Sequence, residues 1–377
     1  MTGLVYLDYN SSTPLDPEVL EAMLPFLRDR HGNPASAHAA GRVLAAAVEE
    51  ARAETAALVG AAPDEIVFTS GGTESNNWVL AGAVPEPRGA HVVISAVEHF
   101  SVLEGARRLE RAGAAVTAVP VDGEGGVDAG AVAGAIRPET RLVSLMLAQN
   151  EVGTVQPVAE VAAAARAGGI AVQTDAAQAA GKIPVDVAAL GVDFLTVAGH
   201  KLCGPKGIGA LYVRRGTGIA PWMLGAPHER GLRAGTLNVP GIVGLGAAAR
   251  IARRSVLDEG LRLRSLSARL WEALRARIPG VVLNGPALDA PGRLPNTVNV
   301  SFPGVRSYDL LARVTGVAVT AGAACHSGDP SPSATLMAMG LPLERALGAV
   351  RFSLGRRTTP AEIELAAALF AEGMGVA

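Results

Sequence analysis

The sequence predicts an α/β protein with a mostly parallel sheet covered by helices on both faces, and a smaller α+β domain beside it. The chain has 377 residues, which is too long for one small core and favours one large and one small domain. Short β-branched runs alternate with alanine-rich helical stretches, as in the units of a parallel sheet. After about residue 255 this alternation gives way to one amphipathic stretch followed by short strands.

Five apolar runs are predicted to contain strands of the large sheet. They are EIVFTS (65–70), HVVISAV (91–97), RLVSLMLAQNEVG (141–153), IAVQTDAAQ (170–178) and VDFLTVAGHK (192–201). The first is followed by GGTESNNWVLAGAV, the second by EHFSVLEGARRLERAG and the third by VAEVAAAARAGG, each with the composition of a helix. Because strands alternate with helices, we expect a mostly parallel sheet that is buried on both faces.

The second unit has a different order of predicted elements, with one amphipathic helix followed by short strands. SVLDEGLRLRSLSARLWEALRARIPG carries apolar residues at three- and four-residue spacing and ends in Pro-Gly, which predicts an amphipathic helix. The runs VVLNG, TVNVSF, VAVTAG and VRFSLG follow as short strands separated by turns. We therefore assign residues 16–255 to the large domain, and residues 1–15 together with 256–377 to the small one.

Composition excludes several classes of protein. The net charge is −2 and the isoelectric point about 6.4, so no basic surface suggests direct nucleic-acid binding. No apolar run approaches the length of a membrane span, and the first residues do not resemble a signal peptide. Two cysteines, Cys203 and Cys325, do not make a disulfide framework, which fits a reducing cytoplasm. The sequence suggests no metal site.

Polar residues follow each predicted strand. The strand ends carry SGGTES, EH, QNE, DAAQ and GHK. Ligands of open α/β sheets collect at the carboxyl ends of the parallel strands, so these residues are expected to share one site.

SGGTES combines the features of an anion-binding turn. Its glycines let backbone N–H groups approach an anion, the following helix contributes its dipole, and Thr73 adds a hydroxyl. The alternative is a simple helix-capping turn.

Lysine is rare in this chain, which uses arginine for most of its positive charge. Only Lys182, Lys201 and Lys206 occur among 33 basic residues. Lys201 follows a predicted strand, and arginine cannot replace lysine where an amine must form an imine with a carbonyl. The alternative for Lys201 is a solvated surface lysine; Lys182, in GKIPVD, and Lys206, in GPKG, are interpreted as loop residues.

Three further residues have both a functional and a structural interpretation. Asp175 could pair with a protonated ring nitrogen or cap a helix, and His99 could stack on a ring, shuttle protons or simply pack. Cys325 lies in a Gly/Ser/Pro-rich loop that suits a nucleophile, whereas Cys203 is interpreted as structural. A phosphate-binding turn, an aspartate, a lysine and a histidine together describe a pyridoxal phosphate site.

The ordered motifs resemble those of the cysteine desulfurases, which are fold-type I, class V aminotransferase-like pyridoxal phosphate enzymes. The motifs are YLDYNSSTPLDPEV, HGNPASAHAAG, EIVFTSGGTESNN, VEH, QNEVG, TDAAQAAGKIPVDV, GHKLCGPKGIGALYVRR, HERGLRAGT, PNTVNVSF and VRFSLGRRTT. The resemblance spans almost the whole chain and implies a mostly parallel seven-stranded sheet in the large domain.

The resemblance also implies a role for each site residue. The cofactor would be held by Gly72, Thr73 and His200 at its phosphate, Asp175 at its ring nitrogen, Gln178 at its phenolic oxygen, His99 against its ring and Lys201 at its aldehyde. Thr236 would reach the phosphate from the other subunit of a homodimer. Asn150 would lie near the cofactor and the substrate, and Arg351 would bind the substrate carboxylate. L-Cysteine would become L-alanine, and Cys325 would take the sulfur as a persulfide for a sulfur-acceptor protein.

Some positions depart from the family pattern. Ala198 stands where many members have serine, Cys203 replaces a frequent tyrosine, and LAQNE (147–151) replaces HVNNE. GAACHS and RLVSLMLAQNEVG are similar to selenocysteine lyases, which leaves selenocysteine open as the substrate. His326 beside the nucleophile could tune its pKa or be an ordinary loop residue. A catalytically silent scaffold and a class V transaminase are the remaining alternatives.

Overall fold

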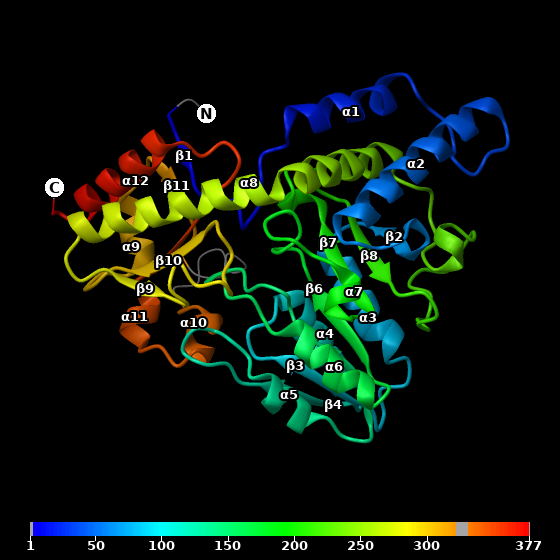
Figure 1. Cartoon of the computed structure of the whole chain (residues 1–377), viewed down its shortest axis with the longest axis horizontal. Coiled ribbons are helices and arrows are strands. Elements are labelled where there is room, and N and C mark those ends of the chain that lie inside the picture. Colours follow the sequence, from blue (N-terminus) through cyan, green and yellow to red (C-terminus); the bar gives the residue numbers. More distant parts are fainter. Residues whose placement is uncertain (1–2, 322–330, 377) are drawn as a thin grey trace.

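The computed structural model describes residues 3–321 and 331–376 of the chain (Figure 1). Seven strands form the central sheet in the order β2-β8-β7-β6-β5-β3-β4. Their bounds are β2 (Ile66–Thr69), β3 (His91–Ser95), β4 (Ala115–Val119), β5 (Thr140–Ser144), β6 (Ala171–Asp175), β7 (Phe194–Ala198) and β8 (Gly209–Val213). The strands from β7 to β4 pair in parallel, and only β8 runs antiparallel to its neighbours β7 and β2. The predicted fold class is confirmed.

Helices cover both faces of this sheet, as the alternation of strands and helices predicts. The helices associated with it are α1 (Pro17–Arg28), α2 (Ala39–Leu58), α3 (Gly72–Ala83), α4 (Phe100–Arg111), α5 (Ala129–Ala135), α6 (Val158–Ala167), α7 (Val187–Leu190) and the first half of α8 (Val239–Arg277). Apolar side chains of α3 and α4 pack against one face. Those of α2, α6 and α8 pack against the other face. Helices therefore bury both faces of the sheet, which explains why most strand residues are apolar.

A second core, together with a separate small cluster that includes Leu336 and Ala346, holds the remaining elements. An antiparallel sheet runs in the order β12-β10-β9, and β1 pairs in parallel with β11. The bounds are β1 (Val5–Tyr6), β9 (Val282–Asn284), β10 (Thr297–Ser301), β11 (Val317–Ala318), β12 (Ala349–Ser353), α9 (Ser307–Arg313), α10 (Ala334–Ala338), α11 (Leu343–Leu347) and α12 (Pro360–Gly373). The first described residues pack here, because β1 contributes to the second core.

The long helix α8 connects the two cores (Figure 1). The helix predicted in SVLDEGLRLRSLSARLWEALRARIPG is confirmed, but it is the later part of α8, which begins earlier, at Val239, and continues without a break to Arg277. Its first part, with Ile242 and Leu245, packs in the large core, and its later part, with Leu263 and Leu270, packs in the second. The proposed domain boundary at residue 255 thus falls inside a continuous helix and stays a prediction.

Within residues 3–321 and 331–376, no helix combines the length and the apolar character that a membrane span requires.

Candidate active site

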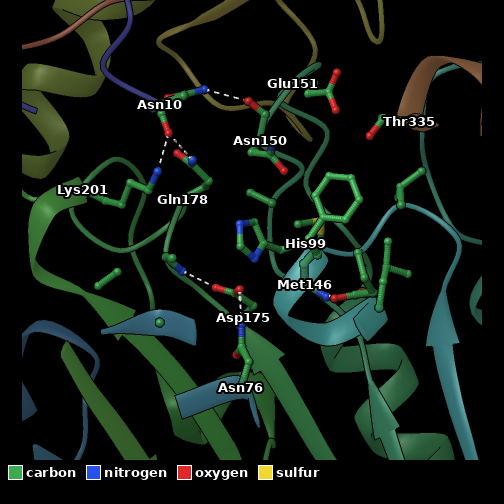
Figure 2. A pocket seen from close by; sticks show the side chains of 18 of the residues that line it. Asn10, Asn76, His99, Met146, Asn150, Glu151, Asp175, Gln178, Lys201 and Thr335 are labelled. Atoms are coloured by element: carbon green, nitrogen blue, oxygen red, sulfur yellow. Dashed lines mark hydrogen bonds between the residues drawn. The ribbon is translucent and has the colours of Figure 1, made fainter. Parts of the chain in front are cut away.

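A cavity of about 330 Å³ opens at the carboxyl ends of the parallel strands (Figure 2). Its size is that of a small-molecule pocket, and its position is the one expected for ligands of open α/β sheets. Most residues that the sequence assigns to the site line it: Gly72, Thr73, His99, Asn150, Asp175, Gln178, His200, Lys201 and Arg351. Ala198 lines it as well. The structure therefore gathers strand-end residues that lie far apart in the sequence.

Lys201 reaches the cavity from a 3₁₀ turn, Gly199–Lys201, that directly follows β7. Its Nζ donates to the backbone carbonyl oxygens of Asn10 at 2.5 Å and Ser11 at 2.7 Å. Figure 2 shows this amine pointing toward Asn10, at the end of the cavity that also holds Gln178. The lysine is thus positioned by the turn and by the N-terminal segment of the chain.

Asp175 is the last residue of β6, and only 6% of it is exposed. Its carboxylate accepts the side-chain N–H of Asn76 at 2.6 Å and the backbone N–H of Ala177 at 2.9 Å. The side-chain oxygen of Asn76, Oδ1, accepts two hydrogen bonds of 2.8 Å each, from the side chains of Gln173 and Thr196. Because these donors fix the Asn76 oxygen, its NH₂ group must face Asp175. Asn76 is a site residue that the sequence did not suggest, although it lies one helical turn after Gly72.

His99 is the N-cap residue of α4 and lines the cavity near Asp175. Its Nδ1 accepts the backbone N–H of Ser101 at 3.1 Å and lies 2.7 Å from the Ser101 hydroxyl oxygen, which in turn accepts from Asn76 at 2.9 Å. Burial lowers the pKa of His99; Asp175 opposes this and Lys201 adds to it. The pattern assigns the ring proton to Nε2 and favours an uncharged imidazole, which suits packing against a planar ring.

Another part of the cavity lining, at the start of α3, is suited to an anion. Gly72 and Thr73 form the first turn of α3, and no side chain caps its backbone N–H groups. The preceding Gly71 has φ +150, a conformation that residues with a Cβ rarely adopt. His200 lines the same cavity, with Nδ1 3.3 Å from the Ser12 hydroxyl oxygen. Open N–H groups at a helix N-terminus attract phosphate and other anions.

The pKa of His200 leads to a prediction about acid stability. Burial, followed by the charge of Lys201, lowers this pKa from 6.5 to about 4. Lys206, Lys182 and His99 act in the same direction. Between pH 6.5 and about 4 the unfolded chain binds a proton here that the native chain does not. The associated stability is therefore present above pH 6.5 and lost as the pH falls.

Denaturant unfolding of the cofactor-free protein at pH 7 and pH 4.5 measures this effect. The His200→Asn variant should lose less stability than the wild type over that interval, by on the order of 2 kcal/mol. Equal losses in the two proteins would show that His200 is protonated normally in the native state.

Arg351 lies in β12, with only 3% of the residue exposed. Its guanidinium donates to the Asp8 carboxylate at 2.9 Å, the Ser11 hydroxyl at 2.7 Å and the Asn150 carbonyl oxygen at 3.1 Å. Its Nε has no partner among the described residues. The arginine is therefore held rigidly at the cavity wall with hydrogen-bonding capacity to spare.

Asn10 contacts several residues of the cavity, although the sequence did not suggest it as a site residue. It is 1% exposed, and its backbone carbonyl oxygen accepts from both Lys201 and Gln178. Its side-chain N–H groups donate to the Asn150 carbonyl oxygen at 3.1 Å and the Thr297 hydroxyl at 2.8 Å. One residue from the N-terminal segment therefore positions three residues of the cavity.

Glu98, in the strand-end pair EH, also lines the cavity, although the sequence assigned it no separate role. One of its carboxyl oxygens accepts the Met146 backbone N–H at 2.8 Å, and the other has no partner among the described residues. Burial raises the pKa of Glu98 well above its usual range, and Asp175 raises it further. A neutral carboxylic acid at this wall follows from these surroundings.

Comparisons with known proteins agree with this geometry. The family model Aminotransferase class-V matches residues 5–365. A cysteine desulfurase IscS from Dictyoglomus turgidum is 45% identical over 363 residues, which are 95% of this chain and 91% of that protein. The chain belongs to the cysteine desulfurase branch of the class V aminotransferase family. The resemblance predicted from the motifs is confirmed.

Solved structures support the same family. A NifS-like protein superposes with a TM-score of 0.92 at 37% identity and covers 99% of each chain. A structure described as SspA in complex with cysteine has a TM-score of 0.81 at 34% identity, covering 93% of this chain and 98% of that one.

Thr236, which the family resemblance assigns to the site, is exposed and does not line the cavity, as a residue predicted to act in the other subunit of a dimer would be. Cys325 and its neighbour His326 lie outside the described residues. Cys203 is partly buried, with its backbone N–H donated to the Thr13 hydroxyl at 2.9 Å, and burial raises its thiol pKa.

Proposed function

We propose that the chain is a pyridoxal-phosphate-dependent cysteine desulfurase that converts L-cysteine to L-alanine and takes the sulfur onto Cys325 as a persulfide. The observation that carries this proposal is that the Lys201 amine and the Asp175 carboxylate lie in one cavity beneath the uncapped start of α3. Relatives with this name at 45% identity support it.

The residues of the cavity fit pyridoxal phosphate in their chemistry. We assign the phosphate to Gly72, Thr73 and His200, which present open N–H groups and an imidazole. Asp175, held by two N–H donors, would accept the N–H of the pyridine ring. When bound, the cofactor supplies an electron sink next to the substrate Cα.

The protein's own residues then have distinct tasks. Lys201 provides the amine for the cofactor aldehyde and a base for the Cα proton, and His99 lies against the ring as an uncharged imidazole. Arg351, which lines the cavity, would bind the substrate carboxylate through its planar guanidinium near Asn150. Since Arg351 is buried and the others are partly buried and held by hydrogen bonds, these groups would orient the substrate without reorganisation.

Cys325 would accept the sulfur in a balanced exchange. L-Cysteine and the Cys325 thiol give L-alanine and the Cys325 persulfide, with no external oxidant. The described residues on either side of residues 322–330 support this assignment, because residues on both sides contact the site or its neighbours. The Thr320 hydroxyl donates to Asp8 at 2.7 Å beside Arg351, and Ser333 donates to the cavity residue Glu151 at 2.6 Å.

The sulfur acceptor, the oligomeric state and the cellular compartment are inferred from the proposed function. A persulfide needs an acceptor, so we infer delivery to an iron–sulfur scaffold or a sulfur-carrier protein. Thr236, exposed and outside the cavity of its own chain, would complete the phosphate site of a second copy in a homodimer. A chain that relies on a reactive thiol and has two cysteines fits a reducing cytoplasm.

Mass spectrometry after incubation with L-cysteine tests the proposed function. The cofactor-loaded protein should form alanine, and one added sulfur atom should map to the peptide that contains Cys325. Formation of 3-mercaptopyruvate together with a pyridoxamine form of the cofactor would instead indicate a transaminase. Turnover of selenocysteine without turnover of cysteine would indicate a selenocysteine lyase, the alternative suggested by GAACHS.

A further inference from the structure

Lys182 follows the strand-end residues of β6 and lies behind the cavity, although the sequence suggests only a loop lysine. Its backbone is in a turn, but its Nζ is directed inward. This amine donates to the side-chain oxygen of Asn10 at 2.9 Å and also to the side-chain oxygen of Gln178. Lys182 does not line the cavity itself, whereas both of its partners do.

These contacts determine which way the Gln178 amide faces. The backbone carbonyl oxygen of Asn10 can only accept a hydrogen bond, so the Gln178 NH₂ must face it and the Gln178 oxygen faces the Lys182 amine. The amide NH₂ therefore faces the other way, and one of its hydrogens is donated to the Asn10 carbonyl oxygen at 2.9 Å. The second hydrogen remains for an acceptor in the cavity that Gln178 lines.

We propose that Lys182 is a positioning residue that fixes the Gln178 amide with its N–H toward the cavity, where it donates to the phenolic oxygen of the bound cofactor. This inference rests on the proposed function, because it needs a ligand with an anionic oxygen at that place. Without Lys182 only the hydrogen bond to the Asn10 carbonyl oxygen orients the amide, so the amide is less firmly fixed, and a turned amide would present its oxygen to that anion, which is repulsive.

The surroundings of Lys182 keep this arrangement intact over a wide pH range. Burial lowers the pKa of Lys182 well below that of an exposed lysine, and the charges of Lys201 and Arg351 lower it further, while Cys203 acts in the opposite direction. Loss of one proton does not remove the contact, because a neutral amine still has two N–H groups for its two carbonyl partners. Position 182 therefore requires a long side chain that ends in at least two N–H donors.

The test compares Lys182→Met, which removes the donor, with Lys206→Met, which alters an exposed lysine in a turn. The readouts are the affinity of the cofactor-free protein for pyridoxal phosphate and the pH titration of the visible absorption band. Lys182→Met should bind the cofactor about tenfold more weakly and titrate about one pH unit higher, because an N–H donor that stabilises the anionic oxygen is lost. Lys206→Met should match the wild type.

A double-mutant cycle separates this role from a direct effect of charge. If Lys182 acts through Gln178, then Lys182→Met should change little once Gln178→Ala is in place. An equal shift in both backgrounds would overturn the proposal, and so would a wild-type titration in Lys182→Met. If that variant does not fold, as judged by circular dichroism, Lys182→Gln replaces it, since its shorter side chain cannot reach both oxygens.

The outcomes distinguish this inference from the proposed function. A wild-type protein that takes up no pyridoxal phosphate contradicts the proposed function. A wild type that binds the cofactor beside an unchanged Lys182→Met contradicts only the positioning role.

Discussion

Lys201→Ala should lower the rate of alanine formation from L-cysteine by about a thousandfold or more. The amine at the end of β7 is held at the cavity by the carbonyl oxygens of Asn10 and Ser11, so no other group of the described chain stands in the same place. The remaining cofactor contacts are unaffected, so the variant should still bind pyridoxal phosphate reversibly. Its visible band should shift to that of free cofactor in the absorption spectrum.

The control for this variant is Lys206→Ala, since Lys206 is exposed in a turn five residues further on. That protein should keep wild-type turnover and the wild-type spectrum. Wild-type turnover in Lys201→Ala would show that Lys201 takes no part in the reaction, and it would contradict the proposed function of the cavity.

Cys325→Ala should abolish formation of the protein persulfide and lower alanine formation by about a hundredfold or more, since the acceptor of the sulfur atom is gone. The spectrum of the bound cofactor should not change, because the residues that contact it are intact. Mass spectrometry and an alanine assay measure the two effects on the same sample.

The second cysteine of the chain provides the matched control. Cys203 is partly buried, and burial raises its thiol pKa, so it is poorly suited to act as a nucleophile. Cys203→Ala should therefore keep the persulfide and the turnover of the wild type. A persulfide that persists in Cys325→Ala but disappears in Cys203→Ala would reverse the assignment of the nucleophile.

Local pattern was sufficient to predict the class of fold. The apolar runs at β2, β3, β5, β6 and β7 stand out because both faces of the sheet are buried. The strand β4 does not stand out, because it lies at the edge of the sheet and two of its residues are exposed. The early start of α8 was missed because its first part is rich in alanine and glycine and packs closely on α2, which weakens the amphipathic pattern.

The site was predictable where a residue type is tied to chemistry at a strand end. Lys201 and Asp175 belong to this class, and their roles remain predictions. Asn10, Asn76 and Lys182 were not predictable in the same way. Asn10 and Asn76 matter through hydrogen bonds to residues more than ninety positions away in the sequence. Lys182 matters through a hydrogen bond to Gln178 across a turn. Such contacts exist only after the N-terminal segment has been brought to the carboxyl ends of β6 and β7.

The most direct measurement is reduction of the cofactor-loaded protein with borohydride, followed by peptide mapping of the pyridoxyl label. The chain has only Lys182, Lys201 and Lys206 as lysines, so the three possible positions are easily resolved. We predict that the label maps to Lys201 alone. A label on Lys182 or Lys206, or no label at all in a folded protein saturated with pyridoxal phosphate, would contradict the account.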